Sequence, residues 1–284
     1  MFERGAYMKL TTVIVIYNME IEKTKTIESL KNNKLFFECE NMDSQVIIYD
    51  NGNSPQDCPQ IFKNQVYIHD ERNIGIVTAY NKAWEIASNK KNDWLLLLDQ
   101  DTEITEDYLK RTIAALSNNQ QEENIVAIVP TVYSNEKVVS PVFLDSLRPL
   151  KNTMPSKGLQ EKKVMAINSG AVIRVSFLNE INGFNKEFPL DYLDHWLFHT
   201  IYEKNRKIFL SDAKLNHDLS VMNYNTISLG RYKSIVDSEV RYYNKYLPDK
   251  KIQFKKHLFL RMMKQAISVK NKRIFLYTAK QIFK

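Results

Sequence analysis

The chain is poor in glycine and cysteine and carries no long apolar run. Its seven glycines are too few for a glycine-rich phosphate loop, and its two cysteines, Cys39 and Cys58, lack the spacing of a metal site. We expect both to be free thiols in a reducing cytosol. No run approaches the roughly 18 apolar residues of a membrane-spanning helix, and residues 1–20 contain no long uncharged core. We therefore expect neither a spanning helix nor a signal peptide.

The positive charge of the chain is concentrated at one end. The formal net charge is +7, from 40 basic and 33 acidic residues. Residues 250–284 contain 11 Lys and Arg and no acid, which leaves 29 basic residues (40 minus 11) against 33 acidic ones before them. A hydrophobic fraction of 44% fits a packed globule. The chain is thus a mildly acidic body with a basic tail, and the tail indicates an anionic partner, either lipid or nucleic acid.

Apolar, β-branched segments alternate with segments of helical periodicity over the first 130 residues. Strands are predicted at residues 11–18, 45–53, 66–73, 94–101 and 124–130, and helices at residues 20–32, 77–88 and 106–116. Short connections between them indicate an α/β domain with a doubly wound, mostly parallel sheet. Residues 135–163 are predicted as a loop-rich insertion, and residues 166–174 as another strand. Beyond Leu210 the chain becomes polar, then basic and helical.

The run WLLLLDQD, residues 94–101, leads an apolar strand directly into two carboxylates. A short, uniformly apolar run is typical of a strand buried on both faces of a parallel sheet. Asp99 and Asp101 then lie at its carboxyl end, where open α/β sheets bind their ligands. Two carboxylates that converge there suit Mg²⁺ or Mn²⁺. The alternative is a solvated loop whose acids cap the following helix.

Polar residues also follow the second and third predicted strands. Asp50 begins the turn Asp-Asn-Gly-Asn, and Asn73 precedes Gly75. Each could be an ordinary turn, because Asp, Asn and Gly are favoured in turns. Together with Asp99 they predict a nucleotide site along one edge of the sheet.

As an ordered set, these segments resemble the family-2 glycosyltransferases of the GT-A fold. The resemblance rests on TVIVIYN, VIIYDNGN, ERNIGIVTAYNKAWEIA and LLLLDQDTEI, and later on INSGAVIRVSFLNEINGFNKEFPLDYLDHW. The DQD form and the segment RYYNKY, residues 241–246, resemble bacterial rhamnosyltransferases of polysaccharide assembly. The resemblance covers residues 9–246.

The resemblance implies a role for particular residues of the donor site. It places Tyr17, Asp50, Asn73 and Asp99 beside the nucleotide, with Asp50 as an acceptor for the base. A Mg²⁺ or Mn²⁺ ion would be held by Asp101 and Asp99, together with His217 of LNHDLS. A single histidine is equally compatible with a purely structural role.

The segment DYLD, residues 191–194, offers two carboxylates at the predicted start of a helix. Acids there are also favoured by the helix dipole. The resemblance implies that Asp194 is the catalytic base, with Asp191 as its neighbour, in an inverting transfer. His195 and Trp196 follow Asp194 directly. The implied donor is dTDP-rhamnose, and a UDP-hexose (UDP-galactose or UDP-glucose) remains the alternative.

The tail IQFKKHLFLRMMKQAISVKNKRIFLYTAK interleaves basic and apolar residues at helical spacing. This pattern is typical of a helix at an anionic membrane surface; the alternative is a helical pair packed on the domain. No nucleic-acid-binding module accompanies the tail, so we expect no nucleic acid partner. The acceptor expected from the resemblance is a glycan or lipid-linked saccharide, which predicts a cytoplasmic enzyme, peripheral at the inner face of the cell membrane. Self-association into a homo-oligomer is left open.

These patterns predict two domains and leave two rival functions. Residues 1–225 are predicted as the GT-A domain, with a donor half at 9–130 and an acceptor half at 131–225, and residues 226–284 as the basic helical tail. A nucleotidyltransferase would also place carboxylates and a metal at a sheet edge, but TTVIVIYNMEIEKTK lacks the glycine of its phosphate loop. The other rival is a catalytically degenerate, membrane-bound scaffold.

Overall fold

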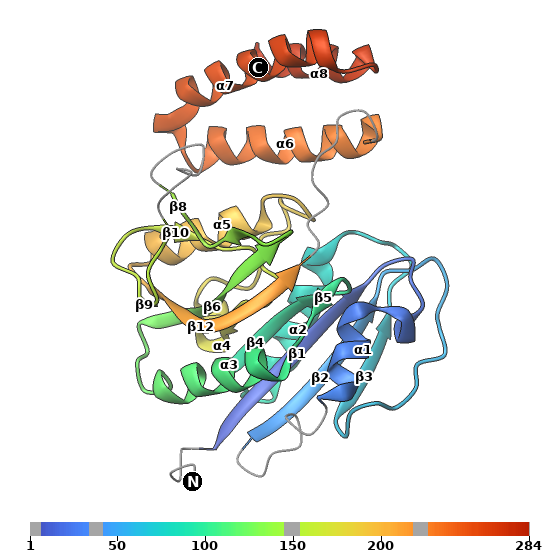
Figure 1. Ribbon diagram of the computed structural model, residues 1–284, viewed down its shortest axis with the longest axis vertical. Coiled ribbons are helices and arrows are strands. Elements are labelled where there is room, and N and C mark those ends of the chain that lie inside the picture. Colours follow the sequence, from blue (N-terminus) through green and yellow to red (C-terminus); the bar gives the residue numbers. More distant parts are fainter. Residues whose placement is uncertain (1–6, 34–41, 145–153, 218–226, 284) are drawn as a thin grey trace.

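The computed structural model describes residues 7–33, 42–144, 154–217 and 227–283, and shows one large mixed sheet covered by helices (Figure 1). The order of its main path is β3–β2–β1–β4–β11–β6–β12–β5. The strands of this path are β1 (Met8–Ile16), β2 (Met42–Asp50), β3 (Gln65–His69), β4 (Trp94–Asp99), β5 (Thr102–Glu103), β6 (Ile125–Ser134), β11 (Val172–Arg174) and β12 (Lys207–His217).

The sheet is mostly parallel, as predicted. Strands β3, β2, β1 and β4 pair in parallel, and so do β6 and β12. The short β11 pairs antiparallel with β4 on one side and with β6 on the other. Two further strands extend the sheet antiparallel, β7 (Lys137–Ser140) on β6 and β9 (Gly158–Leu159) on β12, while β8 (Val142–Phe143) and β10 (Val164–Met165) form a separate pair.

Helices cover both faces of the sheet, which makes it doubly wound. The first face packs against α1 (Lys25–Asn32) and α3 (Glu106–Asn118), and the second against α2 (Ile76–Asn89), α4 (Val175–Glu180) and α5 (Leu193–Glu203). Alternate residues of β4 belong to the two cores: Leu96 and Leu98 to the first, Leu95 and Leu97 to the second. Leucine is therefore needed on both faces, which explains the uninterrupted apolar run.

The register aligns the carboxyl ends of the central strands. Asp50, the last residue of β2, pairs with Ile16 of β1, and Asp99, the last residue of β4, pairs with Val15. Parallel strands that end at one level deliver their following residues to one edge of the sheet. Asp50 and Asp99 therefore reach the same edge, as the sequence predicts.

Three local predictions differ from the structure. The predicted helix at residues 20–32 is a 3₁₀ turn, η1 (Ile21–Lys23), followed by α1, which Thr24 caps by accepting from the backbone N–H of Ile27. The predicted strand at 166–174 shrinks to β11, because Gly170 has a φ of 82° and closes a turn before it. The third difference is β12, an 11-residue strand in a region predicted as polar and then helical.

The C-terminal residues form a helical layer beyond the sheet, as predicted. It consists of α6 (Leu229–Lys245), the 3₁₀ turn η3 (Pro248–Lys250), α7 (Lys251–Ser268) and α8 (Lys272–Ile282). In Figure 1, α6 lies between the sheet domain and the outer pair α7 and α8. Tyr242 of α6 and Phe254 and Leu258 of α7 belong to the second core. The predicted domain boundary at 225 lies outside the described residues.

The structure also bears on the predictions for the cysteines and for membrane-spanning helices. Cys58 is a free thiol, and burial raises its pKa; Cys39 lies outside the described residues. Among the described helices, none combines the length and the apolar character that crossing a membrane requires.

Candidate active site

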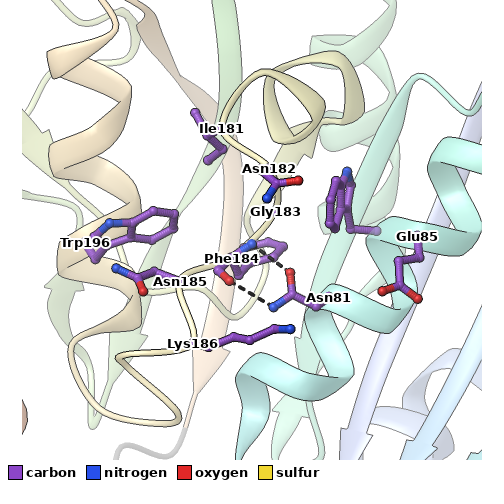
Figure 2. Close-up of a pocket in the computed structure, with 10 residues that line it drawn as sticks. Asn81, Glu85, Ile181, Asn182, Gly183, Phe184, Asn185, Lys186 and Trp196 are labelled. Atoms are coloured by element: carbon purple, nitrogen blue, oxygen red, sulfur yellow. Dashed lines mark hydrogen bonds between the residues drawn. The ribbon is translucent and has the colours of Figure 1, made fainter.

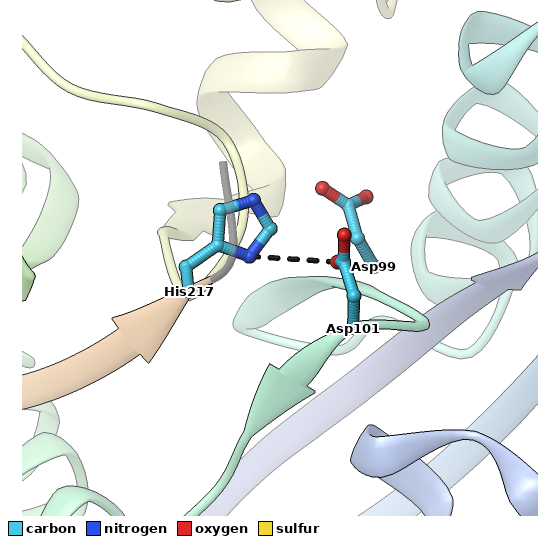
Figure 3. Close-up of side chains that lie close together, drawn as sticks. All are labelled: Asp99, Asp101 and His217. Carbon is cyan, nitrogen blue, oxygen red and sulfur yellow. Dashed lines mark ion pairs between the residues drawn. The ribbon is translucent and has the colours of Figure 1, made fainter. Parts of the chain in front are cut away.

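Three predicted residues meet at the carboxyl edge of the sheet. Asp99 ends β4, Asp101 lies in the turn that follows, and His217 is the last residue of β12. Antiparallel pairing between β5 and β12 aligns Thr102 with His217 and so brings the histidine to the aspartates. One ligand atom from each of the three lies within 4.8 Å of the other two. Figure 3 shows the imidazole facing Asp101, with His217 Nδ1 3.5 Å from Asp101 Oδ1.

A short chain of hydroxyl groups fixes this geometry. Ser169 Oγ accepts from the backbone N–H of Asp99 (3.2 Å) and lies 2.7 Å from Thr102 Oγ1. The same Thr102 oxygen lies 3.1 Å from His217 Nδ1. The hydroxyl of Thr26, on α1, adds support: it lies within hydrogen-bond distance of the backbone oxygens of Asp99 and Thr102 and accepts from the backbone N–H of Thr102. No local feature of the sequence indicates the contact of Ser169 with Asp99, because that contact depends on the fold.

Burial sets the electrostatics of the cluster. It raises the pKa of Asp99 to about 6; the charge of His217 opposes this rise and that of Asp101 adds to it. Tyr80 of α2 donates to Asp99 Oδ1 (3.3 Å), and burial, followed by the charge of Asp99, raises the pKa of this phenol well above its ordinary value. Tyr80 was not a predicted site residue, because it reads as one more apolar position of the helix at 77–88.

The donor set of the cluster fits a divalent cation. Two carboxylates and an imidazole suit Mn²⁺ or Mg²⁺, which also bind waters and substrate phosphates. Oδ1 of Asp101 is buried and has no hydrogen-bond partner among the described residues. Since a buried polar atom without a partner is costly, this oxygen is suited to a ligand that the chain itself does not provide.

A third carboxylate, Asp194, reaches the same region from α5. Its charge acts on both Asp99 and Tyr80. Asp194 Oδ1 accepts from the backbone N–H of His195 (2.8 Å) and lies 2.9 Å from its Nδ1. Burial acts to raise the pKa of Asp194, but the charge and hydrogen bonds of His195 outweigh it and lower the pKa. The His195 ring is stacked on Tyr192, at 4.3 Å between centroids, so the imidazole is held in place.

Asp191 does not join this group but forms a bidentate ion pair with Arg231 of α6. Arg231 Nη2 lies 2.7 Å from Asp191 Oδ1, and Nη1 contacts Oδ2. Ser234 also donates to Oδ2 (3.3 Å). The aspartate therefore fastens the segment before α5 to the C-terminal layer.

The remaining predicted nucleotide contacts lie along the same edge with different exposure. Asp50 is fully buried: its Oδ1 accepts from the backbone N–H of Gly52 (2.8 Å) and its Oδ2 from Gln56 (3.1 Å) and Tyr67 (2.9 Å). A nucleotide base would have to share a carboxylate that already accepts hydrogen bonds from the loop after β2. Asn73 is exposed, with a φ of 43°.

Tyr17 is tied to the DQD turn through the middle residue of that motif. The side-chain oxygen of Gln100 accepts from the backbone N–H of Tyr17 (2.8 Å), and its backbone oxygen from that of Thr26 (3.3 Å). The Tyr17 ring is 45% exposed, so it is available to a ligand. Gln100 was not a predicted site residue, because nothing local in the sequence shows what it contacts.

A cleft of about 960 Å³ opens at the ends of β2 and β3 and is lined in part by Tyr49, Asp70 and Arg72. Arg72 pairs with both oxygens of Asp70 at 2.7 Å, and the Tyr49 hydroxyl donates to the same carboxylate (2.7 Å). The sequence offered no signal for this group, since Asp70 and Arg72 resemble ordinary turn residues.

A second cavity, of about 600 Å³, is lined by residues of α2 and of the segment 181–186 (Figure 2). The Asn81 side chain bonds both backbone groups of Phe184, at 2.9 Å and 2.8 Å. Gly183 has a φ of 79°, and a Cβ there would lie 2.5 Å from the Trp84 ring. The glycine and the amide thus fix the acceptor segment against α2.

Comparisons with known proteins bear on the family and the fold of the chain. The sequence model of a family described as glycosyl transferase family 2 matches residues 11–181. No curated protein matches the chain. Among solved structures, S. aureus TarS is similar with a TM-score of 0.50 at 14% identity, over 96% of this chain and 53% of that one. S. aureus TarS 1–349 is similar with a TM-score of 0.50 at 14% identity, over 97% of this chain and 88% of that one. The chain thus spans about half the length of full TarS, and the likeness concerns the fold.

Proposed function

Because the chain belongs to glycosyl transferase family 2 and is therefore a glycosyltransferase, we propose that it transfers a sugar from a nucleotide diphosphate sugar to a hydroxyl group of a growing surface glycan. The observation that carries this proposal is the meeting of Asp99, Asp101 and His217 at the carboxyl edge of the sheet, within electrostatic reach of Asp194. Such an edge is the usual ligand site of an open α/β sheet.

In this proposal the donor half, residues 9–130, supplies most of the nucleotide site. Asp99, Asp101 and His217 would hold the Mg²⁺ or Mn²⁺ ion. When bound, the cation neutralises the negative charge that develops on the departing diphosphate. Asp50, Asn73 and Tyr17 would contact the nucleotide, and Gln100 keeps the Tyr17 loop against the DQD turn.

Asp194 is the proposed catalytic base. The acceptor oxygen forms a bond to the anomeric carbon while the bond from that carbon to the diphosphate oxygen breaks, with inversion. The acceptor proton passes to Asp194 in the same step, because a carboxylate can deprotonate a sugar hydroxyl only as the anomeric carbon becomes electrophilic. His195 keeps Asp194 ionised and oriented. Asp191, bound to Arg231, holds the segment in front of the base.

The proposed donor is dTDP-rhamnose, on the strength of the DQD motif and the segment RYYNKY at 241–246. A UDP-hexose such as UDP-galactose or UDP-glucose is the alternative donor. The proposed acceptor is a lipid-linked saccharide in the acceptor half, residues 131–225. The enzyme would then be peripheral at the inner face of the membrane, with residues 226–284 as its membrane-proximal tail.

Calorimetric titration of the full chain with UDP and with dTDP tests the donor site. Each titration is done with Mn²⁺, with Mg²⁺ and with EDTA, on the wild type, on Asp101→Ala and on Asp107→Ala. The Asp107 side chain is exposed on α3 and makes an ordinary surface pair with Arg111, so that variant is the matched control. We expect cation-dependent binding that Asp101→Ala abolishes and Asp107→Ala retains. The preferred nucleotide then decides between a dTDP and a UDP donor.

Absence of nucleotide binding by a folded wild type would overturn the donor site and favour the degenerate scaffold. Binding that is equal in EDTA would refute the cation but keep the nucleotide.

A further inference from the structure

Helix α7 has one buried face and one exposed apolar face. Phe254, Leu258 and Gln265, spaced at helical intervals, are buried against the rest of the protein. A second set on another side of the helix is exposed. It consists of Ile252 (73%), Phe259 (50%), Leu260 (57%), Met263 (48%) and Ile267 (88%). The spacing of seven, four and four from Ile252 to Ile267 places these side chains along one stripe. The core thus accounts for one face only.

Helix α8 continues this exposed surface. Leu276 is 61% exposed, and Lys272, Arg273 and Lys280 are exposed around it at helical spacing. In Figure 1, α7 and α8 together form the outermost layer of the molecule, with α6 beneath them. We refer to the exposed apolar side chains of α7 and Leu276 as the outer face.

Lysines border and interrupt the outer face on α7. Lys255 and Lys256 lie among its apolar residues, and with Ile252, Phe259 and Leu260 they line a hollow of about 510 Å³. Lys264 follows Met263 and is exposed. No ion pair joins these three lysines to an acid within the described part of the chain, and residues 250–284 contain no acid.

From this combination we infer that the outer face docks on the anionic surface of a lipid bilayer. An apolar stripe that lies among lysines matches the boundary between acyl chains and charged headgroups. The lysine stems can lie along the apolar layer while their ammonium groups reach the phosphates. A nucleic acid would match the lysines but not the exposed Ile267, Phe259 and Leu276. The inference rests on the proposed function in one respect: the lipid-linked acceptor proposed there gives the reason for binding to a membrane.

The helical layer is also bonded to the site, so docking would orient the acceptor region. Lys245 of α6 pairs with Glu187 at 2.6 Å and 2.8 Å, and Arg231 pairs with Asp191. Both acids precede Asp194 in the segment that leads into α5. A bilayer against α7 and α8 would therefore lie at a fixed position relative to the proposed base, as a lipid-linked acceptor requires.

Vesicle flotation of the full chain tests the inference. The probe is a vesicle of phosphatidylcholine with about one third phosphatidylglycerol, compared with phosphatidylcholine alone, without donor or added metal. The basic set is tested by Lys256→Glu, Lys264→Glu and Lys280→Glu in one chain. Its control carries the same charge change at Lys63, Lys90 and Lys137, which are exposed on the sheet domain.

We expect binding to the anionic vesicles only. At about fivefold per basic residue near the surface, the tail triple variant should lose about a hundredfold or more in partitioning, while the control keeps most of its binding. Ile267→Ser with Leu276→Ser should lose about tenfold or more. Its control is Met154→Ser with Leu159→Ser, which are 46% and 40% exposed elsewhere.

Three results would overturn the inference: no flotation of the wild type, equal losses in the tail variants and their controls, or preferential binding to a single-stranded oligonucleotide. Sedimentation of the free protein tests whether a second copy of the chain covers the outer face instead. A dimer that Ile267→Ser with Leu276→Ser dissociates, without vesicle binding, would show that a second copy covers the outer face. Asp101→Ala should float as the wild type does. Membrane binding is thereby tested separately from nucleotide binding.

Discussion

Nδ1 of His217 lies 3.5 Å from Oδ1 of Asp101, an oxygen that is buried and has no hydrogen-bond partner among the described residues. The imidazole comes from the last residue of β12 and the carboxylate from the turn after β4. The short pairing of β5 with β12 brings the two together.

Substitution of His217 by Gln should weaken Mn²⁺ binding by about tenfold and Mg²⁺ binding by less. Imidazole suits Mn²⁺ better than Mg²⁺, which prefers oxygen ligands. Calorimetry of each ion in the presence of the bound nucleotide measures the change. His199→Gln is the control, because His199 lies on α5 in an aromatic group with Tyr242 and Tyr246. Equal affinities in the His217 variant and the wild type would remove the histidine from the cation site.

Asp194→Asn should strongly slow transfer while the donor still binds. Loss of a positioned base costs about 10² to 10⁴ in rate, so kcat should fall by that factor with little change in the affinity for the nucleotide. Single-turnover transfer to an acceptor hydroxyl, together with nucleotide titration, gives both quantities. Retention of full kcat in this variant would transfer the role of base to another residue.

His195→Ala should move the acid limb of the kcat/KM profile to higher pH. His195 lowers the pKa of Asp194 against the effect of burial, so removal of the imidazole raises that pKa. Since the base must be ionised, activity then appears only at higher pH. A pH–rate profile of the variant beside the wild type measures the shift; two profiles that differ only in height would indicate a structural role for His195.

Arg231→Ala and Asp191→Asn should have effects that do not add. The two side chains form one bidentate pair, with Asp191 largely buried and Arg231 42% exposed. A double-mutant cycle in urea should therefore give a coupling of about 1 kcal/mol. Both single variants should raise the acceptor KM more than the donor KM, because the pair holds the segment before α5. Additive effects on stability would show that the pair contributes nothing as a unit.

The group of Asp70, Arg72 and Tyr49 predicts how stability depends on pH. The hydrogen bonds from Arg72 lower the pKa of Asp70 far below its usual range; burial opposes this and the bond from Tyr49 adds to it. The native state thus favours the ionised carboxylate. Its stabilisation is complete above the unfolded pKa of about 4 and is lost as the pH falls towards the folded pKa.

Urea unfolding at several pH values between neutral and acid conditions measures this dependence. Asp70→Asn should be less stable than wild type at neutral pH, and its stability should fall less steeply towards low pH. Asp107→Asn is the control, since Asp107 is exposed and makes only a surface pair. If the wild-type and Asp70→Asn curves run parallel down to low pH, Asp70 is not the group responsible.

The sequence was sufficient wherever the signal is local. Four leucines before Asp99 determined a strand buried on both faces, because each face of the sheet is covered and alternate residues enter different cores. The chain itself then places Asp99 and Asp101 at the end of that strand. The alternation of Ser211, Ala213, Leu215 and His217 as buried positions could also have predicted β12, but the interleaved polar residues led to a polar reading.

Long-range pairing decided what the sequence left open. The residues around His217 contain no local signal that β12 pairs with β5. The residues around Asp191 likewise contain no signal that Arg231 of α6 binds it. The sequence likewise predicted an amphipathic tail, but only packing shows which apolar residues enter the core and which form the outer face. Periodicity and chain adjacency are properties of short segments, whereas a site assembled from β4, β12 and α5 depends on how those segments pair and pack.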